Sequence, residues 1–333
     1  IGNVTEAAII AIDGAPVGSV VTNGAITDVY NQQVNNGTAL NKFKDFSVDN
    51  GHVTNLQLDA YGNFKAADRQ INLVTNKINI DGVVNAFKDG KIGGDIYFFS
   101  SNGMAVGSTG VINVGRLTIG TSAHAAEEIY KDYASYNAKT AAQKNEFLII
   151  DRETFEVDGK TYYKEKINDG NIKVDGVVNS IGNIILSAKE VTVGADASLN
   201  AGASFKNDGK VSSGATAEDY RSQIINLTGI NKADTAVATS SGDIVLFGKD
   251  NVGFSGDAVT NGGKFDVSSE ATISFTGTTA NAETNTPENK VVVVTDGGDI
   301  AVNTVRGSTG TISVEVVNAV LDASDKATDG TAN

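Results

Sequence analysis

Side chains that could support catalysis are scarce in this chain. It contains two histidines, His52 and His124, and no cysteine. A Ser-His-Asp arrangement needs a positioned histidine, and protein zinc sites draw mainly on histidine and cysteine. His52 follows an Asn-Gly turn and His124 stands at the start of an expected helix, so we predict that both are surface residues. We therefore expect no catalytic residue, no bound metal and no cofactor, and a protein that is not an enzyme.

The carboxylates give little more chemistry. Asp and Glu number 40 against 26 Lys and Arg, a net charge of −14. Glycan-cleaving enzymes need clustered carboxylates, whereas here they mostly stand alone beside turn residues. The sequence at 296–299, Asp-Gly-Gly-Asp, is closer to a turn than to a calcium loop. Phosphate backbones and anionic lipids repel so acidic a chain, so we expect no nucleic-acid partner. We also expect no transmembrane segment, because no apolar run approaches about 20 residues.

The elements that must position these residues are short and repeated. Residues 78–85 read INIDGVVN and residues 172–179 read IKVDGVVN, while Gly-Asp-Ile or Gly-Asn-Ile units begin at Gly94, Gly182, Gly242 and Gly298. Short β-branched runs, separated by Gly, Asn and Asp and returning in a similar order, are typical of stacked β repeats. We predict an all-β protein, a right-handed parallel β-helix (solenoid) with an amino-terminal cap and a helix-plus-hairpin insertion.

Turn signals divide the chain. Asp-Gly or Asn-Gly pairs, which tolerate positive φ, stand at 13–14, 23–24, 36–37 and 50–51. We assign residues 1–75 to a capping region with the first coils, 76–120 to regular coils, 121–167 to an insertion outside the coils, and 168–320 to continued coils. Residues 321–333 are a polar tail or a truncation point. The chain starts at Ile1 without a signal peptide, so we expect a trimmed part of a longer protein.

The insertion differs in composition from the rest. Residues 123–145 are rich in Ala, Glu, Lys and Gln, which favour a helix, and we predict a hairpin over residues 146–164 with its turn at Asp158-Gly159. Five tyrosines lie in this block: Tyr130, Tyr133, Tyr136, Tyr162 and Tyr163. Insertions in repeat proteins often carry recognition, although a merely structural flap is an equal alternative. We favour packing of the tyrosines onto the coils over a partner surface.

Three stretches resemble a known family. Asn41 to Val48 (NKFKDFSV) resembles the Asn-x-Phe-x-x-Phe-x-Val phrase of two-partner secretion domains, the amino-terminal domains of filamentous haemagglutinin-like exoproteins. Ile71 to Thr75 (INLVT) is similar to the segment before that family's first regular coils. Residues 101–117 resemble its Asn-Pro-Asn-Gly-Ile phrase with the trailing Ile-Asn-Val-Gly. Ser100 and Ser101 depart from the family's Asn and Pro, and a second Asn-Pro-Asn phrase is missing, so the chain looks most like the divergent leukotoxin-like filamentous adhesins.

The resemblance carries several expectations. It implies a parallel β-helix with a capped amino end, read by an outer-membrane β-barrel transporter with POTRA domains, and a downstream passenger that binds host cells or bacteria. It implies a secreted or cell-surface location in a Gram-negative (diderm) bacterium after transit through the periplasm. The residues carried over as a transporter-recognition or structural motif are Asn41, Phe43, Phe46, Asn102, Gly103 and Asn113. Asn102-Gly103 is either an ordinary turn or an export signal.

We therefore interpret the chain as a non-enzymatic secretion and folding-nucleation module of a large exported adhesin or cytolysin. A parallel array can grow one strand at a time from one end, which suits a chain that emerges through a pore. Two alternatives stay open. One is an extracellular β-helix that binds or cleaves glycans, which carboxylates converging in one groove would favour. The other is an adhesive stalk without an export signal.

Overall fold

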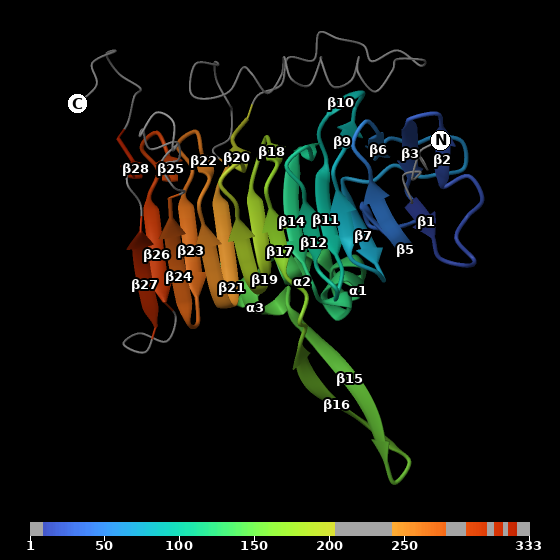
Figure 1. The fold of residues 1–333 in the computed structure, drawn as a ribbon. Helices are drawn as coiled ribbons and strands as arrows, with labels where there is room; N and C mark the ends of the chain where they lie inside the picture. The colour runs from blue at the N-terminus through green and yellow to red at the C-terminus, as the bar shows by residue number, and fades with distance from the viewer. Residues whose placement is uncertain (1–8, 204–241, 278–290, 305–309, 316–318, 325–333) are drawn as a thin grey trace, which may run out of the picture.

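The computed structural model describes residues 9–203, 242–277, 291–304, 310–315 and 319–324 of the chain. It is mostly β. Strands lie side by side in one elongated array, short strands lie around its amino-terminal end, and a long hairpin projects away from it (Figure 1). The predicted tail at 321–333 lies outside the described residues from position 325 onward.

The larger sheet has fifteen strands within the described residues. Its main path runs through β14 (Arg116–Gly120), β11 (Asp95–Phe99), β7 (Arg69–Val74), β5 (Thr38–Val48), β8 (Ile78–Ile80), β12 (Met104–Val106), β17 (Ile172–Val174), β19 (Ile184–Val193), β21 (Ile244–Phe254), β23 (Phe265–Ser269) and β26 (Ile300–Thr304). Four strands pair beside this path: β1 (Ile9–Ala11), β4 (Gln33–Asn35), β24 (Thr272–Thr276) and β27 (Thr311–Glu315).

The second sheet has eleven strands in the described part of the chain, and along its path they follow sequence order. The path is β2 (Val20–Asn23), β3 (Ile26–Tyr30), β6 (Val53–Gln57), β9 (Val83–Lys88), β13 (Val111–Val114), β18 (Val177–Ser180), β20 (Ser198–Ala201), β22 (Asp257–Val259), β25 (Val291–Val294) and β28 (Ala319–Asp322), with β10 (Lys91–Ile92) beside β9. From β3 onward every neighbour on this path is parallel.

The predicted right-handed parallel β-helix is wrong, because the larger sheet closes on itself. From β14 the path passes through β11, β7, β5, β8, β12 and β17 to β19, and β19 pairs again with β14, which makes a closed ring of eight parallel strands. Two long strands cause the closure. β5 pairs with β7 through residues 38–43 and with β8 through 47–48, and β19 pairs with β14 through 184–186 and with β17 through 191–193. The fold is therefore a mostly β protein with a closed eight-stranded parallel β-barrel, and an open solenoid is not what the pairing shows.

Antiparallel pairs surround the first parallel strands. β1 and β4 each pair antiparallel with β5, and β2 pairs antiparallel with β3. An uncovered strand edge offers free N–H and C=O groups to other chains. These short strands satisfy such groups beside the first parallel strands.

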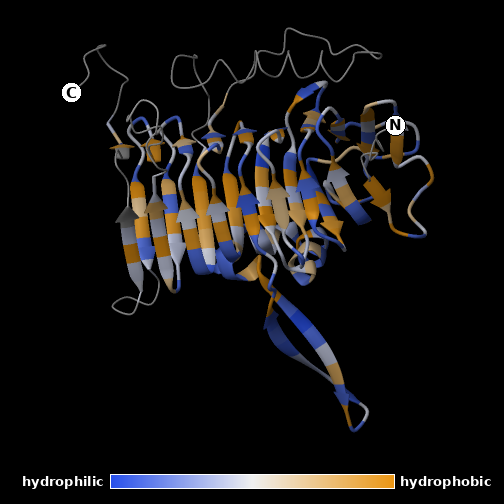
Figure 2. Ribbon diagram, in the orientation of Figure 1, coloured by the Kyte–Doolittle hydropathy of each residue, from blue (hydrophilic) through white to orange (hydrophobic). Residues whose placement is uncertain are grey.

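The main core lies between the strands and runs along the array. It is built from alternate, fully buried Val, Ile, Leu and Phe side chains, as in the buried-intermediate alternation of β23. Figure 2 shows apolar bands recurring on strand after strand. Alternation of this kind fixes the register, because a slip by one residue would turn the apolar set outward.

A column of glycines explains the recurring Gly-Asp-Ile units. A Cβ on Gly242 would lie 2.3 Å from the carbonyl oxygen of Gly182, and one on Gly298 would lie 2.0 Å from that of Gly263. Such approaches of backbone to backbone leave no room for a methyl group. The next position supports the neighbouring turn, because the Asn183 Oδ1 accepts from the Asp243 backbone N–H at 2.9 Å.

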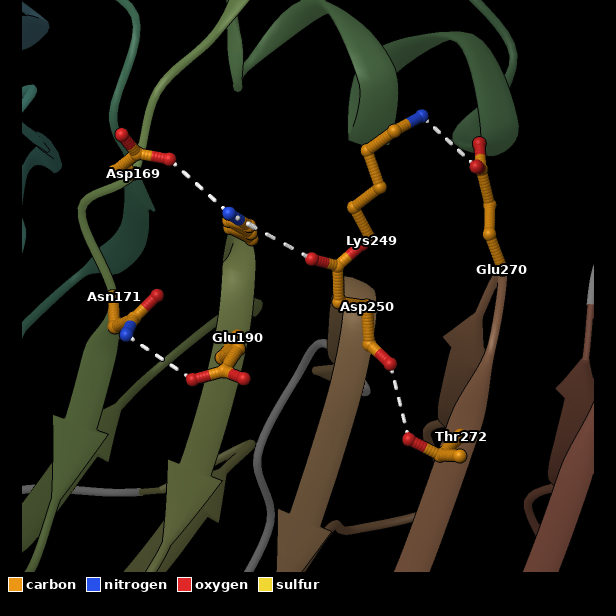
Figure 3. Close-up of polar contacts among 8 residues, drawn as sticks. Asp169, Asn171, Glu190, Lys249, Asp250, Glu270 and Thr272 are labelled. Carbon is orange, nitrogen blue, oxygen red and sulfur yellow. Dashed lines mark hydrogen bonds and ion pairs between the residues drawn. The ribbon is translucent and has the colours of Figure 1, made fainter.

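Polar side chains link neighbouring strands at the bends of β19 and β21. The Lys189 Nζ lies 3.1 Å from the Asp169 Oδ1 and 3.9 Å from the Asp250 Oδ2. The Lys249 Nζ lies 2.8 Å from the Glu270 Oε2, and Figure 3 shows this second pair. The Lys249–Glu270 pair is the more buried, with side chains 25% and 12% exposed. Less solvent screening gives it the larger contribution to stability.

The predicted helix at 123–145 forms three short helices: α1 (Ala123–Lys131), α2 (Tyr133–Asn137) and α3 (Ala141–Phe147). Asp132 ends α1 and caps α2, since its side chain accepts from the Ser135 N–H. Thr140 forms a capping box with Gln143 that starts α3. Asp and Thr are preferred N-cap residues, so each interrupts the helix. The hairpin follows as β15 (Ile150–Val157) and β16 (Lys160–Ile167).

The helices cover the outer face of the larger sheet near β7 and β11. Ala125, Ala126 and Ile129 of α1 are buried there in a second apolar cluster, which also contains Tyr97 and Tyr136. The prediction that the tyrosines pack onto the strands therefore holds for Tyr136, which is buried, and for Tyr130 and Tyr133, which pack against the same cluster and are partly buried. It fails for Tyr162 and Tyr163, which are 46% and 58% exposed on the hairpin.

Candidate functional site

Three of the six predicted site residues belong to the core of β5. Asn41 is fully buried, its Oδ1 accepts from the Gln32 N–H at 2.7 Å, and its Nδ2 donates to the Asn72 Oδ1 at 3.3 Å. Phe43 and Phe46 are fully buried and make an edge-to-face pair with ring centroids 5.3 Å apart. These side chains hold the first parallel strands together and present no surface to a partner.

Asn102 and Gly103 form the turn between β11 and β12. The Asn102 side chain is exposed and its Nδ2 donates to the Thr75 carbonyl at 2.8 Å. Gly103 has φ +85°, and a Cβ there would lie 2.2 Å from the Asn171 carbonyl oxygen. The positive φ and the close backbone contact therefore require glycine at position 103, whereas the Asn102 side chain is exposed to a possible partner.

Asn113 belongs to a row of buried asparagines across the second sheet. Asn55, Asn85, Asn113, Asn179 and Asn200 occupy the same register position on successive strands. Each Nδ2 donates to the Oδ1 of the preceding asparagine, at 3.3, 3.0, 3.0 and 2.9 Å from Asn85 onward. The role of Asn113 in this asparagine row is to join two strands.

A polar groove of about 640 Å³ joins the exposed Asn102 to the insertion. The turn before β12, helix α1 and the base of the hairpin supply its walls. Its charged or titratable lining residues are His124, Glu127, Glu128, Lys131, Asp151, Arg152, Glu153, Lys166 and Asp169. The structure thus brings Asn102 next to the predicted insertion. Gly103 shares its turn without lining the groove, and the other four predicted motif residues lie elsewhere.

Asp151 fixes the geometry at the floor of this groove. Its Oδ1 accepts from the Ser122 hydroxyl and from the His124 backbone N–H, both at 2.9 Å. Its Oδ2 accepts from the Nδ2 of the buried Asn168 at 2.8 Å. The same Asn168 amide donates to the Thr121 carbonyl at 2.7 Å. These bonds lock the start of α1 to β15 and to the residue that follows β16.

Most carboxylates of the groove are engaged in ion pairs. The Glu127 Oε1 lies 2.6 Å from the Lys42 Nζ of β5, and the Glu153 Oε1 lies 3.1 Å from the Lys166 Nζ. The hydrogen bond and charge of Lys166 lower the pKa of Glu153. A general acid needs the opposite shift. In the parts of the chain that the structure describes, no three His, Asp or Glu side chains are grouped so that they could hold a metal ion.

Sequence reasoning missed a charged cluster beneath α2 and α3. Arg69, Asp95 and Arg116 are register neighbours on β7, β11 and β14. The Arg69 guanidinium lies 3.7 Å from the ring centroid of Tyr133. Burial raises the pKa of Asp95 to about 6, against the opposing effect of Arg116 and of the hydrogen bond from the Tyr97 hydroxyl. These residues are far apart in the sequence, so only the strand register brings them together.

The comparisons with known proteins give a distant structural likeness. No family model and no curated protein matches the chain. A solved structure, the crystal structure of the filamentous hemagglutinin secretion domain, is 15% identical with a TM-score of 0.43, over 94% of this chain and 99% of that one. None of the described helices is long and apolar enough to cross a bilayer.

Proposed function

We propose that this chain is a non-enzymatic secretion and folding-nucleation module of an exported adhesin or cytolysin. Its recognition partner would be an outer-membrane β-barrel transporter with POTRA domains, and its location the surface or medium of a diderm bacterium. The observation that carries the proposal is the strand order of the second sheet. Along its path, each strand pairs with the strand of the same path that follows it in the sequence. A chain that emerges amino end first can add these strands one after another.

Two further features support the proposal. Antiparallel strands surround the first parallel strands, so the growing array starts beside satisfied edges. The stretch at 101–117, which resembles the family's conserved phrase, places Asn102 at the rim of the polar groove. Export recognition is assigned to this rim and to the neighbouring face of α1.

Secretion of a reporter tests the proposal. The full chain, placed between a Sec signal peptide and a reporter enzyme, is expressed in a diderm host together with an outer-membrane β-barrel transporter that carries POTRA domains. We expect the reporter in the medium, and none after deletion of residues 1–120. Asn102→Ala should reduce export severalfold with an unchanged circular dichroism spectrum, whereas the matched variant Asn79→Ala should not. Export of the deletion, or equal export of both point variants, would contradict the proposal.

Order of folding gives a test that needs no transporter. Pulsed hydrogen exchange during refolding of the purified chain reports when each strand gains protection. We expect β3, β6 and β9 to be protected before β22 and β25. Simultaneous protection throughout, or protection of the carboxyl-terminal strands first, would remove the nucleation role while leaving export untouched.

The groove favours a second candidate function, the binding of glycans. Five carboxylates line it, from Glu127, Glu128, Asp151, Glu153 and Asp169, together with amide groups of Asn102 and Asn168. Cleavage is disfavoured because the pKa of Glu153 is lowered and Asp151 is fully hydrogen bonded. Calorimetric titration with neutral and amino-sugar oligosaccharides tests binding, with Glu128→Gln as the variant. The absence of binding heat with both classes of oligosaccharide would reject glycan binding by the groove.

A further inference from the structure

The hairpin of β15 and β16 carries features that secretion and the groove do not explain. It projects from the array (Figure 1), and its two outer edges pair with no other described strand. Phe155, Val157 and Tyr162 are each 46% exposed. An isolated two-stranded hairpin is marginally stable in water, and a free strand edge is a template for pairing with another chain.

Charge along β15 is complementary to itself. In an antiparallel pair of two β15 strands centred on Thr154, residue 152 of one copy lies opposite residue 156 of the other. Arg152 then faces Glu156 of the second copy, and two-fold symmetry produces this ion pair twice. Among the described residues Glu156 has no ion-pair partner, and Arg152 lies over the Tyr163 ring at 4.5 Å.

The edge of β16 lacks this complementarity. An antiparallel pair of β16 strands centred on Tyr163 would place Lys160 opposite Lys166 of the second copy, twice. Like charges directly opposite one another destabilise a strand pair. Of these two registers, the one along β15 is favoured by charge, so we take β15 as the edge that pairs with an identical chain.

Apolar contacts and shape agree with this choice. Phe155 stacks on Tyr162 within the hairpin, with ring centroids 5.8 Å apart. Around Thr154 the two Phe155 side chains would occupy diagonal positions on one face, a spacing of about 7–8 Å that aromatic side chains can bridge. Antiparallel pairing points the two hairpin tips in opposite directions. The two strand arrays therefore lie at opposite ends of the new sheet and do not collide.

We propose that two copies of this chain dimerise by antiparallel pairing of their β15 edges, which creates a four-stranded sheet between them. The occupant of the edge is a second copy of the same chain, and the Arg152–Glu156 pairs set its register. The inference does not depend on the secretion role, since it uses only the hairpin.

Charge reversal with mixing tests the dimer. Sedimentation equilibrium of the full chain should show a monomer–dimer equilibrium. Arg152→Glu and Glu156→Arg should each weaken dimerisation about tenfold or more, because each variant faces itself with like charges. An equimolar mixture of the two variants restores both ion pairs and should restore the dimer. A chain that is monomeric at every concentration, or a mixture that stays monomeric, would overturn the proposal.

A cysteine cross-link tests the register. The chain has no cysteine, so any disulfide comes from the introduced residue. Thr154→Cys places the two sulfurs at the symmetry axis and should give a covalent dimer under mild oxidation. The matched control Thr161→Cys, on β16, should stay monomeric. Cross-linking of the control but not of Thr154→Cys would assign dimerisation to the other edge and refute the β15 interface.

Discussion

Replacement of Asn113 by alanine measures the energetic role of the asparagine row. Asn113 is 1% exposed, donates to the Asn85 Oδ1 at 3.0 Å and accepts from the Asn179 Nδ2 at 3.0 Å. Alanine removes both hydrogen bonds and leaves the facing atoms of two buried amides without this partner. Each hydrogen bond contributes about 1 kcal/mol net, and the amide groups left without a partner add a further cost. We therefore expect the free energy of unfolding to fall by about 3 kcal/mol.

Position in the row should set the size of the effect. Asn200 is the last member, because its register partner on β22 is Val259. It makes a single bond to another asparagine, at 2.9 Å to the Asn179 Oδ1. Asn200→Ala should therefore cost about 1.5 kcal/mol, half the cost at Asn113. Asn79→Ala, which removes an exposed 3.3 Å bond to the Lys77 carbonyl, is the control and should cost less than about 0.5 kcal/mol.

Urea unfolding followed by far-ultraviolet circular dichroism measures these free energies, and the nine tyrosines give a second signal in a chain without tryptophan. Coincident transitions from the two signals justify a two-state fit. The reasoning is refuted if Asn113→Ala costs no more than Asn200→Ala. That result would mean that the row adds nothing beyond isolated side-chain hydrogen bonds.

Three other changes test the packing, the Asp95 carboxylate and the ion pairs. Gly242→Ala should destabilise by about 2–4 kcal/mol, since its Cβ would meet backbone at 2.3 Å, whereas Gly253→Ala, with its nearest atom at 3.7 Å, should be tolerated. Burial raises the pKa of Asp95 from 3.8 to about 6, so the folded state binds its proton more tightly than the unfolded chain does. Protonation of Asp95 therefore stabilises the fold fully below about pH 4, and this contribution is lost as the pH rises through 6. Because Asn cannot ionise, Asp95→Asn should raise the free energy of unfolding at pH 7 by about 1–2 kcal/mol. Lys249→Met should cost about 1–2 kcal/mol by leaving the largely buried Glu270 without this ion pair.

Each of these predictions has a contradicting result. Equal melting temperatures for Gly242→Ala and Gly253→Ala would show that the turns can move apart. The urea midpoints of the wild type and of Asp95→Asn are compared from pH 4 to pH 7. The same pH dependence in both would contradict a role of the Asp95 carboxylate in the pH dependence of stability. Lys189→Met is the matched control for Lys249→Met, because the Lys189 ion pairs are more exposed. A greater loss of unfolding free energy in Lys189→Met than in Lys249→Met would contradict the larger contribution assigned to the Lys249–Glu270 pair.

Local features of the fold could be predicted from the sequence. The Asp-Gly and Asn-Gly pairs are turns, with φ of +84° at Gly14, +61° at Gly24, +78° at Gly37 and +92° at Gly51. The Gly-Asp-Ile unit that begins at Gly94 leads directly into a strand, β11, at Asp95–Phe99. Turn chemistry and β-branched runs act over a few residues, which is why they can be read locally.

The closed barrel could not be predicted in this way. It depends on β5 and β19 being long enough to pair with different partners at their two ends. The phrase from Asn41 to Val48 covers only the later part of β5, which begins at Thr38. Sequence spacing does not reveal a partner choice between segments that lie 30 residues or more apart.

The candidate site was partly accessible to prediction. Asn102 followed from the resemblance, whereas for the insertion at 121–167 recognition and a merely structural flap were equal alternatives. The anchoring of the groove by Asp151 and Asn168 gives no local signal, because two strands of the hairpin separate these residues. Asn113, predicted as a motif residue, is explained by its two hydrogen-bonded neighbours.

The asparagine row also has a direction. Asn55 donates to the Asp28 Oδ1 at 3.3 Å, and an ionised carboxylate can only accept. Once Asn55 has turned its amide nitrogen toward Asp28, its oxygen faces Asn85, which must then donate, and each following amide is oriented in turn. The side-chain dipoles therefore add head to tail across successive strands, with their positive end against a negative charge. A single acidic residue at the amino-terminal end thus sets the polarity of the whole row.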